Sequence, residues 1–425
     1  MSIAMLITMC LGFALSISVA VAIGLSALMG TWMSNASMLL AVKEIYGSIN
    51  KFPLAAIPFF ILAGNLMETG GISRRLVEFA KSVVGGVQGG LSATCVLTCM
   101  IFAAVSGSSV ATTFAIGAIL IPALIRHGYP TSYAAALQAT SAELGVIIPP
   151  SIPMIIYGVS AEVSIGELFI AGVGPGILIS AALMAFVLIY ARIKGYGKRD
   201  REGRLPLLKA TWEAGFALFM PVIILGGIYG GIFTPTEASV VAVFYALFVG
   251  IVIHRELGIS DLGRIITKSV ISSTVILFII ANAGLFSYLI TRAGVPDQIG
   301  AFLRATLDSP MIFLLGVNAA LFLIGMFIET SAAIIVLAPI LAPVAAGFGI
   351  DPVHFGLIMV VNLALGMITP PFGVNLFAAC TVARISVDQI IPKLLPFVCV
   401  VLGCLMIITY VPEISLWLRD VVYQR

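Results

Sequence analysis

One segment of this chain occurs twice, each time inside an apolar run, and this duplication limits the folds open to it. Residues 145–150, which end in two prolines, recur as residues 366–371 at an offset of 366 − 145 = 221. The same offset pairs Pro122 with Pro343 without a gap. Because internal repeats mark duplicated structural units, we infer that the chain contains two copies of one unit.

The composition of the whole chain is too apolar for a water-soluble protein. Of its 425 residues, 60% are hydrophobic and 10% are charged, whereas soluble domains carry about 25% charged residues. Apolar runs long enough to cross a bilayer occur along the whole length. The predicted fold class is therefore an all-α polytopic membrane protein. A net charge of +3 without a basic stripe excludes nucleic acid as a partner.

The segments outside the repeats also have distinct patterns. Residues 3–29 lack the basic start of a cleavable signal peptide, so they predict a first retained span. Residues 32–51 and 70–83 mix charged with apolar positions, as in helices that lie along a membrane interface. The basic stretch 194–209 is expected in the cytoplasm by the positive-inside rule. The six cysteines lie within apolar runs, which predicts buried thiols rather than disulfides or a zinc site.

Each copy predicts a re-entrant hairpin followed by a broken helix. Apolar segments flank a short polar cluster, between 89–105 and 110–126 in the first copy and between 311–328 and 332–347 in the second. The double proline then interrupts the next helix, because proline removes a backbone donor and clashes with the preceding turn. Within a bilayer, unwound backbone persists only where protein, water or an ion satisfies it.

The hairpin tips and helix breaks together predict two Na⁺ sites. Carbonyls freed at a break and hydroxyls at a tip form a cage of oxygen atoms, and paired discontinuous helices mark the ion sites of transporters. The alternative is that serine and glycine only allow close helix packing while the prolines only kink. The first predicted metal site comprises Ser106, Ser108, Ser109, Gly145, Ile148 and Pro150. The second comprises Thr330, Ser331, Gly366, Thr369 and Pro371.

Two glutamates lie close to these tips and breaks, where a charge within the membrane is costly. Glu143 precedes the first break, and its repeat partner is Ala364, so Glu143 cannot belong to a symmetric ion site. We expect it either to gate or couple transport, or to make a structural hydrogen bond to a nearby hairpin or helix end. Glu329 on the second tip is a candidate for gating near the ion or for stabilising the tip.

The order of the motifs resembles the large membrane subunit of tripartite ATP-independent periplasmic (TRAP) transporters. The resemblance covers nearly the whole chain and rests on residues 106–111, 145–151, 168–176, 230–238 and 366–375. It implies an elevator-type secondary transporter with two inverted-topology repeats, in the bacterial inner membrane. It also implies Na⁺-coupled uptake of an organic acid, such as a C4-dicarboxylate, a sialic acid or another sugar acid.

The same resemblance implies two protein partners. A soluble periplasmic binding protein would deliver the substrate, and a small four-helix membrane subunit would brace the scaffold within the lipid. Because no helical block precedes Met1 or follows Arg425, we expect the small subunit to be a separate chain.

The substrate is expected between the two hairpin tips. There the Asn375 amide can donate, and the N-termini of half-helices add partial positive charge. The predicted substrate contacts are Ser108, Pro150, Thr330 and Asn375.

The expected organisation has five parts. They are N-terminal scaffold helices with an interfacial arm (1–88), a first transport repeat (89–193), a cytoplasmic linker with scaffold helices (194–310), a second transport repeat (311–412) and a C-terminal tail (413–425).

Two other functions stay open from the sequence. A stand-alone divalent-anion:Na⁺ symporter uses similar hairpins and breaks but needs no binding protein. An intramembrane enzyme such as an aspartyl protease needs paired membrane aspartates, whereas the aspartates here lie in loops or at span ends. No Ser-His or Cys-His set lies at matched depth either, so we predict that the chain is not an enzyme.

Overall fold

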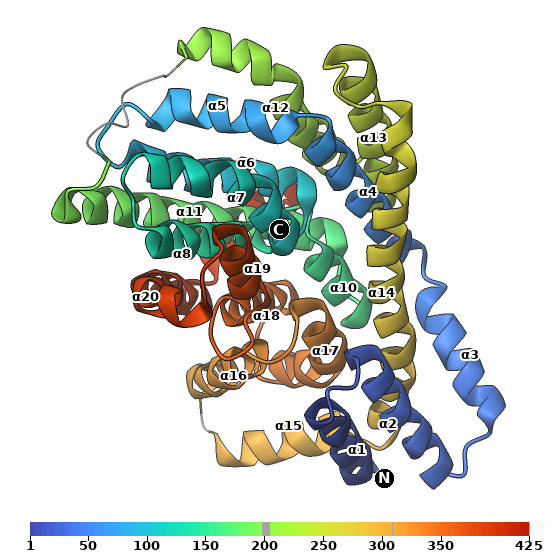
Figure 1. Cartoon of the computed structure of the whole chain (residues 1–425). Helices are drawn as coiled ribbons and strands as arrows, with labels where there is room; N and C mark the ends of the chain where they lie inside the picture. Colours follow the sequence, from blue (N-terminus) through green and yellow to red (C-terminus); the bar gives the residue numbers. More distant parts are fainter. Residues whose placement is uncertain (198–204, 308, 425) are drawn as a thin grey trace.

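The computed structural model describes residues 1–197, 205–307 and 309–424, and this part of the chain folds almost entirely into helices (Figure 1). Within it, eight helices are long and apolar enough to cross a membrane, and a bent helix pair makes a ninth candidate. The predicted all-α polytopic class is therefore confirmed. Residues 198–204 of the predicted cytoplasmic loop lie outside the described residues.

The N-terminal segment forms two helices, so the prediction of one span over residues 3–29 is wrong. Helices α1 (Ser2–Ala14) and α2 (Val19–Met33) lie side by side, and the Ser26 hydroxyl donates to the Met5 carbonyl at 2.6 Å. The chain reverses at Ser16, which has a φ of +58°. Helices of 13 and 15 residues are about 20 and 23 Å long, which is too short for a bilayer core of about 30 Å.

Helices outside the duplicated region lie along the right side and the top of the molecule in Figure 1. The two predicted interfacial segments are the amphipathic helices α3 (Met38–Ile49) and α5 (Ile72–Val84). Helix α14 (Ile259–Arg292), the longest of the described helices, runs along α2, α3 and α4 (Ala56–Thr69) in Figure 1 and also contacts α17 (Thr330–Gly347) of the second copy. The remaining members of this side are η1 (Phe52–Ala55), α4 (Ala56–Thr69), α12 (Leu207–Tyr229), α13 (Pro235–Phe248) with its π-helical extension Val249–Ile253, and α14 (Ile259–Arg292).

The two copies of the repeat have matching helices. The first consists of α6 (Gly90–Ser106), α7 (Ser109–Arg126), α8 (Thr131–Ala142), α9 (Leu144–Ile147), α10 (Ile152–Ser160) and α11 (Ile165–Lys194). The second consists of α16 (Pro310–Gly325), α17 (Thr330–Gly347), α18 (Pro352–Met367), α19 (Val374–Ala383) and α20 (Val387–Tyr410). Shifting the bounds of α7 by 221 residues gives 330–347, which are the bounds of α17.

The structural repeat is longer than the sequence pattern indicated. Shifted by 221, α5 falls on residues 293–305, where the chain forms the amphipathic helix α15 (Val295–Thr306). This helix is absent from the elements that the sequence pattern predicted. Residues 413–423, expected to lie in a C-terminal tail, form helix α21 (Glu413–Tyr423), which packs against α11.

Helices α8 and α18 hold the same place in the two copies, and side-chain contacts show at which end of α11 each of them begins. Tyr133 at the start of α8 stacks on Tyr190 near the end of α11, with ring centroids 5.5 Å apart. The start of α18 lies near the opposite end of α11, because the Arg419 guanidinium contacts both Asp351 at 2.7 Å and Glu167 at 3.9 Å. Helices α8 and α18 therefore begin at opposite ends of α11.

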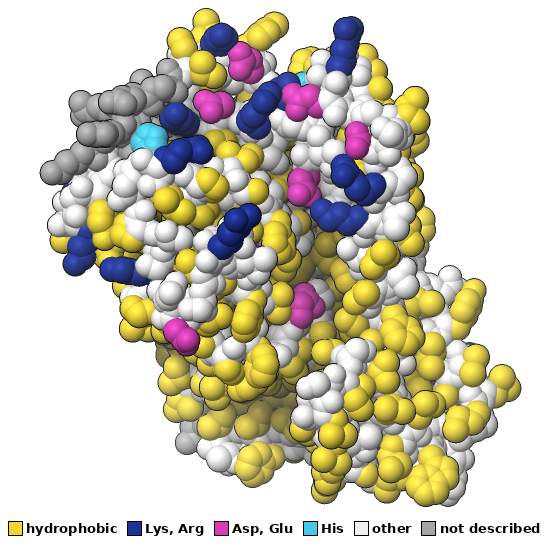
Figure 2. All heavy atoms as spheres, in the orientation of Figure 1, with side chains coloured by type: hydrophobic (Ala, Val, Ile, Leu, Met, Phe, Trp, Pro, Cys, Tyr) yellow, Lys and Arg dark blue, Asp and Glu magenta, His cyan; other side chains and the backbone are white. Residues whose placement is uncertain are grey.

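The surface in Figure 2 separates charged from apolar regions. Charged side chains gather on the part formed by α5, α12 and α13, whereas the part formed by α1, α2 and α3 is mostly hydrophobic. Exposed apolar residues such as Leu39 and Trp32 belong to this second region. A surface of this kind suits contact with lipid tails rather than water.

Candidate functional site

Oxygen atoms of the first hairpin tip gather in a small cluster. Gly107, with a φ of +61°, turns the chain between α6 and α7, and the Ser108 hydroxyl accepts from the Ala111 amide at 3.4 Å. The Ser106 hydroxyl lies 3.0 Å from the Thr112 hydroxyl and 3.3 Å from the Ser108 carbonyl oxygen. The Thr112 hydroxyl donates to that same carbonyl at 2.8 Å.

The first tip lies directly on the broken helix of its own copy. The α8–α9 segment and α10 are bent by 43° across the double proline, and the Ile152 amide donates to the Gly107 carbonyl at 3.3 Å. A Cβ on Gly145 would lie 2.7 Å from the Ser108 carbonyl oxygen. A Cβ on Gly107 would lie 2.9 Å from the Pro150 carbonyl oxygen. Only glycine permits this close approach at either position.

The structure thus brings most residues of the first predicted ion site together. Ser106, Ser108, Gly145 and Pro150 meet at the tip and break. The Ser109 hydroxyl points instead towards the Met367 sulfur at 4.0 Å. The predicted ligand of Ile148 is its carbonyl oxygen, and its side chain packs towards Gly176 of α11.

The second tip is organised by Glu329. Its carboxylate accepts from the Ser331 hydroxyl at 2.9 Å and from the Ala332 amide at 3.2 Å, which caps α17. The neighbouring Thr330 hydroxyl is fully buried and donates to the Met367 sulfur at 2.9 Å. In this conformation Glu329 therefore holds the tip in shape.

The second break also lies against its own tip. Its Phe372 amide donates to the Met326 carbonyl at 3.2 Å, and a Cβ on Gly366 would overlap the backbone of Gly325. The Thr369 hydroxyl turns back to the Leu365 carbonyl at 2.8 Å.

The two breaks differ in exposure. Pro371 and Phe372 at the second break are exposed, whereas Pro150 at the first is buried. Of the second predicted ion site, Thr330, Ser331 and Gly366 are buried, while Thr369 and Pro371 lie nearer the surface. The first site is thus enclosed and the second is partly open.

Three buried polar side chains link the two copies. The Asn375 amide nitrogen donates to the Glu143 carboxylate at 2.6 Å, and the Thr113 hydroxyl lies 3.1 Å from the Asn375 amide oxygen. All three side chains are at most 1% exposed. The amide predicted to face the substrate is therefore bound to Glu143 in this conformation.

Sequence reasoning missed Thr112, Thr113 and Met367. Their repeat partners are Ala333, Ile334 and Val146, so the duplication gave no signal for them. Only the position of the threonines, one helical turn beyond a polar tip, pointed to a role.

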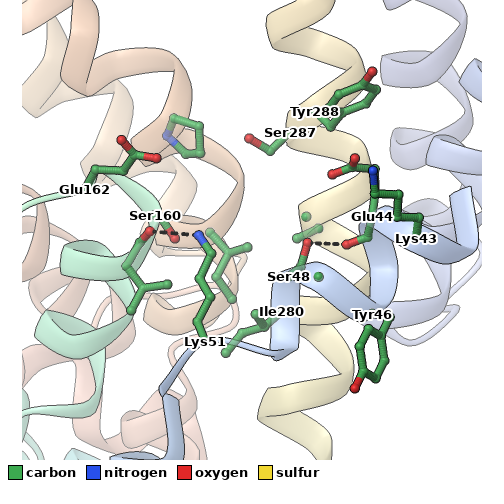
Figure 3. Close-up of a pocket in the computed structure, with 16 residues that line it drawn as sticks. Lys43, Glu44, Tyr46, Ser48, Lys51, Ser160, Glu162, Ile280, Ser287 and Tyr288 are labelled. Atoms are coloured by element: carbon green, nitrogen blue, oxygen red, sulfur yellow. Dashed lines mark hydrogen bonds between the residues drawn. The ribbon is translucent and has the colours of Figure 1, made fainter. Parts of the chain in front are cut away.

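A cleft of about 600 Å³, lined by charged, polar and apolar side chains, separates the repeats from the helices at the side (Figure 3). Lys43, Glu44 and Ser48 of α3 face it from one side, and Ser160 and Glu162 from the other. Lys51 reaches across and donates to the Val159 carbonyl at 3.4 Å. The residues that line the cleft include none of the predicted tip residues.

The polar atoms at the tips are mainly hydroxyl and carbonyl oxygens. Among residues 1–197, 205–307 and 309–424, no three His, Cys, Asp or Glu side chains gather as metal ligands. All six cysteines are free thiols, of which four are buried and two, Cys10 and Cys399, are exposed.

Comparison with known proteins agrees with this architecture. A family profile described as "Tripartite ATP-independent periplasmic transporter, DctM component" matches residues 2–414. The chain belongs to this family. The resemblance seen in the sequence is therefore confirmed, and the chain is a multi-pass protein of the bacterial inner membrane.

Several relatives are named as permeases. The chain is 43% identical to the C4-dicarboxylate TRAP transporter large permease protein DctM of Pseudomonas aeruginosa, covering 90% of this chain and 89% of that protein. It is 35% identical to the sialic acid TRAP transporter large permease protein SiaM of Vibrio cholerae, covering 89% of each. It is also 43% identical to the isethionate TRAP transporter permease protein DctMQ of Oleidesulfovibrio alaskensis, but spans 64% of that relative's length. These names imply transport rather than an enzymatic role.

Two solved transporters share the fold. The YdaH transporter of Alcanivorax borkumensis matches with a TM-score of 0.64 at 15% identity, covering 87% of this chain and 86% of that one. MtrF of Neisseria gonorrhoeae matches with a TM-score of 0.60 at 14% identity, covering 88% and 85%. At these identities the likeness concerns the fold alone.

Proposed function

We propose that this permease takes up a small carboxylate by Na⁺-coupled secondary transport with an elevator mechanism. The observation that carries the proposal is that, in both copies, a hairpin tip is hydrogen-bonded to the break that follows it. Ile152 bonds to Gly107 in the first copy, and Phe372 bonds to Met326 in the second. Such tip and break pairs are where transporters bind ions and substrate.

Sodium ions would be held by neutral oxygens at these two places. At the first, the Ser106 and Thr112 hydroxyls and the Ser108 and Pro150 carbonyls converge on one region. At the second place, the ligands would be the Thr330 and Ser331 hydroxyls and the carbonyl oxygens around Gly366. A cation there would hold each tip on its break and would offset the negative charge of an entering carboxylate.

The expected substrate position lies between the tips, near Ser108, Pro150, Thr330 and Asn375. Both tips already approach one residue, Met367, from opposite copies. Relatives are named for C4-dicarboxylates, sialic acid and 2,3-diketo-L-gulonate, which are carboxylates, and for isethionate, which is a sulfonate. We therefore assign the substrate class as a small organic acid.

Two features support an elevator with inverted repeats. Helices α8 and α18 occupy the same place in their copies but begin at opposite ends of α11. The cleft in Figure 3 lies where the repeats would slide past α3 and α14. We propose that a periplasmic binding protein delivers the acid and that a small four-helix membrane subunit supports α14 and its neighbours.

Uptake into proteoliposomes tests this function. The vesicles contain the permease with its small subunit, and candidate binding proteins loaded with C4-dicarboxylates or sugar acids are added outside. We expect uptake with an inward Na⁺ gradient and none without it. Uptake driven by a proton gradient alone, without Na⁺, would exclude the sodium mechanism.

The same vesicles separate this function from a stand-alone divalent-anion:Na⁺ symporter. Permease alone, given free substrate, should not transport. If it does so as fast as the complete system, the binding protein is unnecessary and the stand-alone symporter is the correct function.

A further inference from the structure

Two buried asparagines join the second hairpin to its broken helix. Asn318 lies on α16, the first arm of the hairpin, and Asn362 lies on α18, the helix that ends at the break. The Asn362 amide nitrogen donates to the Asn318 side-chain oxygen at 2.7 Å and to the Asn318 backbone carbonyl at 3.0 Å. Both side chains are at most 3% exposed, so this asparagine pair is a polar contact in the interior of two packed helices.

The same contact extends to a third helix. The Asn318 amide nitrogen donates to the Thr409 hydroxyl of α20 at 3.0 Å, and that hydroxyl donates in turn to the Leu405 carbonyl at 2.8 Å. The Thr409 side chain is 1% exposed. Helix α16 is therefore held by hydrogen bonds to α18 on one side and to α20 on the other.

The asparagine pair lies close to the second predicted ion site. Asn362 is about one helical turn before Gly366 (366 − 362 = 4), and Asn318 is about two turns before Gly325 (325 − 318 = 7). At these glycines the two helices are in backbone contact, because a Cβ on Gly325 would lie 3.2 Å from the Gly366 Cα. Beyond them, α16 leads into the tip and α18 into the break. The register of α16 on α18 therefore sets how the tip oxygens face the Gly366 carbonyl.

Stability alone does not explain why asparagines occupy these positions. The Asn362 amide oxygen is buried without a hydrogen-bond partner in the described part of the chain, which costs free energy. A hydrogen bond between membrane helices also changes an equilibrium by only about threefold on average. Buried asparagines between helices are better known for fixing the register of the two helices at a cost in stability.

The first copy joins the same two helices with different residues. The repeat partners of the asparagine pair are Leu97 and Ser141. There, Gln138 of α8 accepts from the Cys95 thiol of α6 at 3.2 Å, and the repeat partner of Gln138 is Met359. Each copy thus has its own polar contact between the hairpin arm and the broken helix. A change to the asparagine pair should therefore affect the second copy and leave the first unaltered.

We propose that Asn318 and Asn362 are positioning residues that fix the register of α16 on α18 and thereby hold the second sodium site in shape. A slip by one residue would shift the helices by about 1.5 Å, whereas a binding site tolerates errors of about 0.5 Å. The described hydrogen bonds of the pair reach no predicted ligand, so its effect passes through the contact between Gly325 and Gly366. The sodium part rests on the proposed function, whereas the register part does not.

The first test needs neither sodium nor transport. Hydrogen–deuterium exchange of the purified full-length permease is followed in the peptides that contain Phe372 and Ile152. The Phe372 amide donates to the Met326 carbonyl, which joins the second break to its tip, and the Ile152 amide makes the corresponding contact in the first copy. The wild type is compared with a double variant, Asn318→Leu with Asn362→Ser, which carries the residues of the first copy at both positions.

The double variant loses both hydrogen bonds between α16 and α18. We expect exchange at Phe372 to become about tenfold faster, since each bond contributes about threefold, and exchange at Ile152 to stay unchanged. If exchange at Phe372 is also unchanged, the pair does not fix the register and the proposal is overturned.

A single variant covers the case in which the double variant does not fold. In Asn318→Leu, Asn362 keeps its bond to the backbone carbonyl at position 318, so exchange at Phe372 should become only about threefold faster. No change there overturns the proposal. The matched control is Asn65→Leu, which removes a buried amide contact of the same kind, to Ser269 at 2.9 Å, between α4 and α14. It should leave exchange at Phe372 unaltered, and an equal acceleration in this control overturns the proposal.

Equilibrium binding of radioactive Na⁺ tests the effect on the ion site. In the double variant one of the two proposed sites should weaken about tenfold while the other keeps its affinity, and Asn65→Leu should keep both. Two unchanged sites, or equal weakening of both, overturn the connection to the second site. If the wild type binds no Na⁺, the sodium part of the proposed function fails, while exchange at Phe372 still decides whether the asparagine pair fixes the register.

Discussion

Replacing Gly145 by alanine tests whether the first tip must lie directly on the broken helix. The new Cβ would lie 2.7 Å from the Ser108 carbonyl oxygen and 2.8 Å from the Thr112 hydroxyl, and both atoms belong to the proposed ion site. Reaching an ordinary contact of 3.4 Å moves the carbonyl by 3.4 − 2.7 = 0.7 Å. Overpacking of this kind costs about 1–3 kcal/mol. If the ion-bound state carries that strain, the Na⁺ concentration for half-maximal uptake rises about 5- to 150-fold.

The assay is the Na⁺ dependence of uptake, together with thermal unfolding of the purified protein. Gly316→Ala in α16 and Gly403→Ala in α20 are matched controls, because a Cβ at either position meets nothing within 4 Å. The controls should keep the wild-type Na⁺ dependence and stability. If Gly145→Ala behaves like the controls, the contact between tip and break does not position the ion ligands.

Ser108→Ala and Thr330→Ala should each raise the Na⁺ concentration for half-maximal uptake about tenfold, with unchanged membrane insertion; unchanged titrations in both variants argue against these ligands. Arg419→Ala should lower the free energy of unfolding by roughly 3 kcal/mol, because its side chain, which is 7% exposed, binds Asp351 at 2.7 Å; an unchanged melting temperature would show that the pair contributes nothing. Burial raises the pKa of Asp351, but the hydrogen bonds from Arg419 and from the His354 and Val353 amides, together with the charge of Arg419, outweigh it and hold the pKa below its ordinary value. The stability from this pair is therefore present at neutral pH and is lost as the pH falls through the lowered pKa, and Asp351→Asn should remove that part of the acid dependence in melts between about pH 6 and pH 3.

Local chemistry explains why much of the fold is predictable. The double prolines at residues 149–150 and 370–371 marked both interruptions, whereas single prolines such as Pro122 and Pro343 lie inside continuous helices. Short polar clusters between apolar runs, at residues 106–109 and 329–331, marked both tips, and the 221-residue offset indicated that the pattern was not chance. The prolines and the polar clusters are recognised from their neighbours in the sequence, and the offset is found by comparing the chain with itself, so a single sequence contains all three signals.

Contacts between distant residues explain what was missed. The Glu143–Asn375 hydrogen bond joins residues 232 positions apart, and no spacing rule predicts such a pair. Helix α15 did carry a signal, since Val295, Ile299 and Leu303 recur at helical spacing and are half-buried. The turn at Ser16 had little signal in the sequence, because serine is also common within membrane helices.

The central claim is that each tip and its break hold one sodium ion. Equilibrium binding of radioactive Na⁺ to the purified permease tests it most directly, with Gly145→Ala and Gly366→Ala as site-specific variants. We predict two saturable sites in the wild type and the weakening of one of them in each variant. The absence of saturable Na⁺ binding, or two sites of unchanged affinity in both variants, would contradict the claim.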